Sequence, residues 1–130
     1  MAAKVIKKGL FVALIFFYIV AGWSHFIMPE FYYPLIPDYL PAKVFLNAAS
    51  GLVELLLAIG LIISQSRKCS AFAIILLLLC FIPAHIHLIE RGGCLPSSLC
   101  VSNLMAWLRL FIIHPILIYW AWSFRNFKWN

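Results

Sequence analysis

Long apolar runs alternate with short segments that hold most of the polar residues of this chain. Four of the runs reach the length of about 20 residues that an α-helix needs to cross a hydrocarbon layer of about 30 Å. We place the predicted transmembrane helices at about 9–27, 42–64, 70–88 and 104–124. The pattern therefore predicts an all-α fold, a bundle of four transmembrane helices in a single membrane domain, residues 1–130.

Prolines interrupt this pattern at defined places. Residues 28–43 contain four prolines among tyrosines and phenylalanines, which predicts a structured Pro- and aromatic-rich outer loop between the first two helices, at the membrane interface. Pro83 has no N–H for the carbonyl of Leu79, so a kink is expected near the outer end of the third helix, where it would open a cavity. Pro115 lies inside the fourth helix.

Composition supports the membrane assignment, because 65% of the residues are hydrophobic whereas about half is usual in soluble domains. The net charge is +6, but the Lys and Arg residues gather before the first helix, in the 65–69 hairpin and after the fourth helix. This distribution predicts cytoplasmic termini and membrane lipids as partners, not nucleic acid. We expect a multi-pass protein of a bacterial inner membrane.

Glu54 and Arg109 are charges inside apolar runs, where each costs about 2.5 to 3.5 kcal/mol unless it finds a protein environment. Helical spacing puts Asn47, Ser50, Gly51 and Glu54 on one stripe, and Tyr18, Ala21, Gly22 and His25 on another. Small residues on both stripes would let the two backbones approach closely. Helical rise places Arg109 within reach of Glu54, in a pocket that opens outward, with His25 and His85 near its mouth.

The predicted site therefore consists of candidates for ligand binding or proton relay: Glu54, Arg109, His25, His85, Asn47 and Tyr18. The alternative is that the Glu54–Arg109 pair only locks the bundle together. His85 and His87 lie on nearly opposite helix faces, so only one of them would face the pocket. In the fourth span Ser102, Ala106 and Arg109 form a third stripe, and His114, five positions from Arg109, lies off it. These spacings give no specific metal or haem signal, and no metal site is expected.

Cys94 and Cys100 lie together in the last outer loop, and they would form a short disulfide in an oxidising compartment. Free thiols are the alternative. The pair lacks the Cys-x-x-Cys spacing of dithiol oxidoreductases, which favours a structural role over a catalytic one.

Several segments, in their order, resemble the DoxX-like family of small four-helix membrane proteins. The segments are Ala21-Gly22-Trp23-Ser24-His25-Phe26 with Pro29, Pro37-Asp38-Tyr39-Leu40-Pro41, Gly51-Leu52-Val53-Glu54 with Gly60-Leu61, Phe81-Ile82-Pro83-Ala84-His85-Ile86-His87, and Trp107-Leu108-Arg109-Leu110. The resemblance implies a redox-associated membrane subunit, like the small subunits of a thiosulfate:quinone oxidoreductase. His85 replaces the Asn common in that family, Gln is often found near Pro115, and the cysteine loop is a local addition.

Two functions follow as expectations. The first is a pocket that binds a quinone or another amphipathic molecule, with a membrane or redox partner protein and with homo-oligomerisation open. The second is a non-catalytic assembly factor or chaperone that acts through helix contacts, and small residues facing lipid would favour it. An isomerase of lipid-like substrates rests on fold analogy alone, and a transporter is disfavoured because no inverted repeat is present.

Overall fold

The computed structural model describes residues 1–129, which are mostly helical and contain no β-strand. Four helical segments are long and apolar enough to cross a membrane: Ala2–Ile27, Lys43–Ile62, Arg67–Glu90 and Asn103–Ser123. The predicted fold class is confirmed, and the molecule is a multi-pass membrane protein by the length and composition of these segments. The first helix begins seven residues before the predicted start at residue 9, because lysines are good helix formers and continue it beyond the apolar run.

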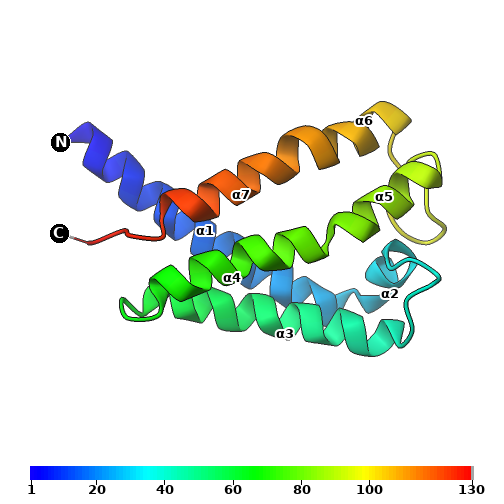
Figure 1. The fold of residues 1–130 in the computed structure, drawn as a ribbon, viewed down its shortest axis with the longest axis horizontal. Helices are drawn as coiled ribbons and strands as arrows, with labels where there is room; N and C mark the ends of the chain where they lie inside the picture. Colours follow the sequence, from blue (N-terminus) through cyan, green and yellow to red (C-terminus); the bar gives the residue numbers. More distant parts are fainter. Residues whose placement is uncertain (130) are drawn as a thin grey trace.

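The helices pack in a simple order (Figure 1). Helix α1 (Ala2–Ile27) packs along α3 (Lys43–Ile62), α3 along α4 (Arg67–Cys80), and α4 along α7 (His114–Ser123). Both termini lie at the end of the bundle that holds the turn between α3 and α4, which we call the termini end. The short helix α2 (Pro29–Tyr32) and the longer connections lie at the opposite end, the loop end.

Helices α1 and α3 approach each other through two glycines. A Cβ atom added to Gly22 would lie 2.8 Å from the carbonyl oxygen of Gly51, and one added to Gly51 would lie 2.7 Å from the Cβ of His25. Both distances are too short for any larger residue without a shift of the helices. The close approach expected from the two small-residue stripes is therefore confirmed, and it sets His25 directly beside α3.

The third and fourth spans are each interrupted. The third divides at Phe81 into α4 and α5 (Ile82–Glu90), with Pro83 in the first turn of α5, as expected from the missing proline N–H. The fourth consists of α6 (Asn103–Leu108), a π-helical segment η2 (Arg109–Ile113) and α7. Pro115 cannot donate to the carbonyl of Phe111, which lies in the wider turn of η2.

The loop end is closed by two ordered connections. Residues 28–42 form α2, the short 3-10 helix η1 (Tyr33–Leu35) and a turn, and Asp38 there forms ion pairs with Lys43 and Arg91, each at 2.8 Å. Cys94 and Cys100 are joined in a disulfide. The loop that it closes contacts α2, because the Ser98 hydroxyl donates to the carbonyl of Phe31.

Arg67 anchors the termini end and is only 4% exposed. Its Nε and Nη2 atoms donate to the carbonyls of Leu61 and Ile62 at 2.7 and 2.9 Å, and its Nη1 atom donates to the carbonyl of Phe127 at 2.6 Å. The first two are orphan acceptors in the last turn of α3. Arg67 therefore caps α3 and holds the C-terminal segment against it, a role that its position in a basic hairpin did not indicate.

Candidate functional site

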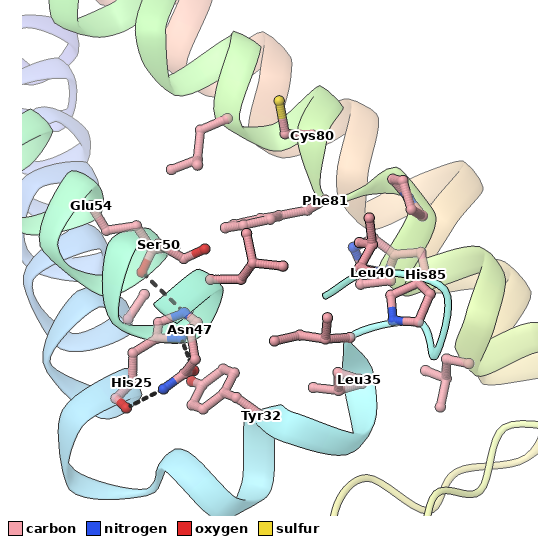
Figure 2. Close-up of a pocket in the computed structure, with 18 of the residues that line it drawn as sticks. His25, Tyr32, Leu35, Leu40, Asn47, Ser50, Glu54, Cys80, Phe81 and His85 are labelled. Carbon is pink, nitrogen blue, oxygen red and sulfur yellow. Dashed lines mark hydrogen bonds and ion pairs between the residues drawn. The ribbon is translucent and has the colours of Figure 1, made fainter. Parts of the chain in front are cut away.

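A cavity of about 340 Å³ lies at the loop end, between α3 and the break that separates α4 from α5 (Figure 2). Most of its lining is apolar, including Leu35 and Leu40 from the loop that closes it. The polar and charged side chains of the lining are those of His25, Tyr32, Asn47, Ser50, Glu54, His85 and Arg109. An apolar cavity with a few convergent polar groups is typical of a small-molecule site.

His25 and Asn47 hold each other through two hydrogen bonds. The Nδ1 atom of His25 lies 2.7 Å from Oδ1 of Asn47, and Nδ2 of Asn47 donates to the backbone carbonyl of His25 at 2.8 Å. The second bond fixes the orientation of the amide, because only its NH₂ group can donate to a carbonyl. Oδ1 must then accept a hydrogen bond from Nδ1–H of the imidazole. The two hydrogen bonds together therefore fix the tautomer of a neutral His25.

This tautomer determines what the ring presents to Glu54. With the proton on Nδ1, the Nε2 atom of a neutral His25 has a lone pair, and it lies 3.5 Å from Oε2 of Glu54. Two acceptors face each other there unless a proton lies between them, whether on the imidazole or on the carboxyl group. Both side chains are buried, at 8% and 3% exposure. The structure therefore places a buried base beside a buried acid, without a hydrogen bond between them.

Tyr32 supports the imidazole from the loop side. Its ring stacks on that of His25 with centroids 3.8 Å apart, and its hydroxyl is hydrogen-bonded to Ser24. Figure 2 shows His25, Asn47 and Tyr32 along one wall of the cavity and His85 on the other side. Helices α1 and α3 and the loop after α1 thus fix one polar wall.

The predicted ion pair between Glu54 and Arg109 is wrong. Glu54 lies beside His25, and the ion pairs within residues 1–129 leave Arg109 out. The reason is the packing order: α3 packs most closely on α1, whereas η2, which carries Arg109, contacts α5, α6 and α7. Both residues nevertheless line the one cavity, and Glu54 Oε2 and Arg109 Nε have no hydrogen-bond partner within those residues. These two atoms are buried and unpaired at the border of the cavity.

The histidines divide as their spacing indicated. His85 lines the cavity, whereas His87 is buried away from its lining. His114 packs against His85 with ring centroids 4.8 Å apart, and its Nε2 atom donates to the carbonyl of Leu78 at 2.7 Å. That carbonyl belongs to the last turn of α4, so His114 stabilises the helix break. Within residues 1–129, no group of three His, Cys, Asp or Glu side chains is placed to hold a metal ion.

Tyr18 is not among the residues that line the cavity. It is 1% exposed and belongs to the apolar core with Phe11 and Leu14, and its hydroxyl has no partner within residues 1–129. The stripe that it shares with His25 reaches the cavity only one turn further along α1, at Ala21. Two lining residues that the sequence did not indicate, Tyr32 and Cys80, carry no spacing signal, since each is the last residue of its helix, beside a change in chain direction.

Fold and site together define a multi-pass membrane protein whose helices line a mostly apolar cavity with a few polar side chains. A family model described as a domain of unknown function (DUF8561) matches residues 14–125, and the chain belongs to this family. The matched segment includes every residue of the cavity lining. No curated protein and no solved structure matches the chain.

Proposed function

We propose that the protein binds an amphipathic small molecule of the quinone type, with its polar head on the His25–Glu54 wall and its apolar part along the rest of the cavity. The observation that carries the proposal is the unpaired Oε2 of Glu54 facing a base of fixed tautomer in a mostly apolar cavity. A volume of about 340 Å³ lies in the range usual for small-molecule sites.

A quinone head group has two carbonyl oxygens on opposite sides of a ring, and its reduced form has two hydroxyl groups. A proton carried by His25 or Glu54 would hydrogen-bond one oxygen, and Arg109 or His85 would hydrogen-bond the other. On reduction of such a ligand the His25–Glu54 pair would release a proton to it, and on oxidation of the ligand the pair would accept one. Electrons would be exchanged with a separate membrane or redox protein.

In the proposed setting, the chain is a small redox-associated subunit of a bacterial inner membrane, in line with its resemblance to DoxX-like proteins. Cytoplasmic termini would follow from the charge distribution, and the cavity would then open away from the cytoplasm. The alternative, an assembly factor that acts through helix contacts, would be favoured by small residues facing lipid. Gly22 and Gly51 face each other inside the bundle, and this favours the ligand-binding proposal.

Titration calorimetry of the purified protein with decylubiquinone tests the proposal. Glu54→Gln and Arg109→Ala should each weaken binding by about tenfold or more, the loss expected when one hydrogen bond to a buried charged group disappears. Glu30→Gln and Arg125→Ala are the matched controls, because both residues lie outside the cavity lining and the first is exposed. Unchanged affinity in both cavity variants, with the fold intact by circular dichroism, would overturn the proposal.

A further inference from the structure

A second pocket, of about 720 Å³, lies at the termini end, away from the cavity of the proposed function. The turn between α3 and α4 and the segment after α7 line it together. Its charged and polar side chains are those of Arg67, Lys68, Arg125, Lys128, Ser64 and Asn126. Four of these six side chains are cations, and the lining contains no Asp or Glu.

Three of the four cations remain available. Arg67 is engaged by the backbone carbonyls of α3 and of the C-terminal segment. Lys68 and Lys128 make no hydrogen bond or ion pair within residues 1–129, and both are exposed. Arg125 lies over the ring of Trp122 and donates to its carbonyl from Nη1 alone, which leaves the rest of its guanidinium free.

The chain offers these cations no acidic side chain. Its four acidic residues lie elsewhere: Glu30, Asp38 and Glu90 at the loop end, and Glu54 in the cavity. Like charges gathered around one hollow repel one another and raise the local potential, and an anion in the hollow lowers that energy. An anion that binds in this hollow would therefore come from outside the chain's own side chains.

The position of the pocket indicates which anion. It lies where the apolar spans end, since α3 ends at Ile62 and α7 at Ser123, and this is the depth of the lipid headgroups. Trp129 lines the pocket and contacts the ring of Phe11. Tryptophan is enriched at the membrane–water interface. We propose that this pocket binds the phosphate group of an anionic ligand, and its depth favours a lipid headgroup over a soluble phosphate.

Native mass spectrometry of the full chain in neutral detergent tests this inference. The protein is titrated with phosphatidylglycerol, with phosphatidylcholine and with inorganic phosphate. Two double variants with the same loss of charge are compared. The pocket variant, Lys68→Gln with Lys128→Gln, loses two charges of the pocket. The control variant, Lys4→Gln with Lys7→Gln, loses two exposed charges at the same end but outside the pocket lining.

We expect one phosphatidylglycerol to bind per chain in preference to phosphatidylcholine. The affinity of the pocket variant for this lipid should fall by about tenfold or more, and that of the control variant should not change. Binding of inorganic phosphate that displaces the lipid would support the phosphate site and assign it a soluble ligand. Equal loss in both variants, equal binding of the two lipids, or full binding by the pocket variant would overturn the inference. If the pocket variant fails to fold, the wild type still decides the inference. A site binds one phosphatidylglycerol per chain, whereas diffuse attraction gives no fixed stoichiometry.

Discussion

The Nδ1 atom of His25 and the Oδ1 atom of Asn47, 2.7 Å apart, determine how the imidazole faces Glu54. A helix stripe alone would place His25 near the carboxylate but would leave its ring free to turn. The amide of Asn47 is itself fixed by the carbonyl of His25, so the orientation does not depend on a bound molecule. A site built in this way has its polar groups in place before a ligand arrives.

Asn47→Leu should leave the imidazole of His25 free to rotate. The carbonyl and the Nδ1–H of His25 would lose their partners inside the bundle, and we expect the free energy of unfolding to fall by about 1–3 kcal/mol. Asn103→Leu, at an exposed position on α6, should leave it unchanged. Nitrogen-15 NMR of labelled histidine provides the direct measurement, and a His25 with its proton on Nε2 in the wild type would contradict the assignment.

Gly22→Ala should separate α1 from α3. The new Cβ atom would lie 2.8 Å from the carbonyl oxygen of Gly51 and 2.9 Å from Cγ of Leu55, so the helices must move. Overpacking of this kind costs about 1–3 kcal/mol, and decylubiquinone binding should weaken with it because His25 moves away from Glu54. Gly9→Ala, in the same helix but with nothing within 4 Å, should be neutral or slightly stabilising. Thermal unfolding of the two variants compares them, and equal losses would contradict the close helix contact.

The spans, the break at Pro83 and the inward polar stripes could be predicted, because hydrophobic length, proline chemistry and helical spacing are local properties of the sequence. The partner of Glu54 could not. A stripe shows which face of a helix turns inward but not which neighbour it meets, and two inward stripes competed for that carboxylate. The facing glycines Gly22 and Gly51 were the signal that α1 would be that neighbour, since they let the backbones of α1 and α3 approach closely.

The residues whose side chains bind backbone carbonyls could not be predicted from the sequence either. Arg67 and His114 donate to carbonyls at helix ends and breaks, and these acceptors arise only when the helices stop where they do. In the sequence, Arg67 is one of several basic residues in a hairpin and His114 is one residue before a proline. Nothing in their spacing separates them from a solvated charge or a ligand-binding histidine.

Asp38→Asn should loosen the loop over the cavity. A hydrogen bond from Lys43, together with its charge and that of Arg91, holds the pKa of Asp38 below its ordinary value of 3.8. A lowered pKa means that the carboxylate favours the folded loop above that ordinary value and loses this effect as the pH falls through the lower, folded value. At pH 7 the amides within residues 36–41 of the variant should therefore be less protected from exchange, relative to their intrinsic rates, and those of the wild type should lose protection only in acid. Exchange measured by mass spectrometry checks this, and Glu30→Gln should not change it.

Arg67→Lys should destabilise the termini end although it keeps the charge. A lysine ammonium is a compact donor that cannot reach three carbonyls in the fork geometry of a guanidinium, so at least one buried acceptor loses its partner. We expect the free energy of unfolding to fall by about 2–5 kcal/mol. The matched control is Arg125→Lys, because Arg125 makes a single hydrogen bond, to the carbonyl of Trp122, and its loss should be below about 1 kcal/mol. Equal effects of the two substitutions in a denaturant titration would show that charge alone, and not the three hydrogen bonds, holds the C-terminal segment to α3.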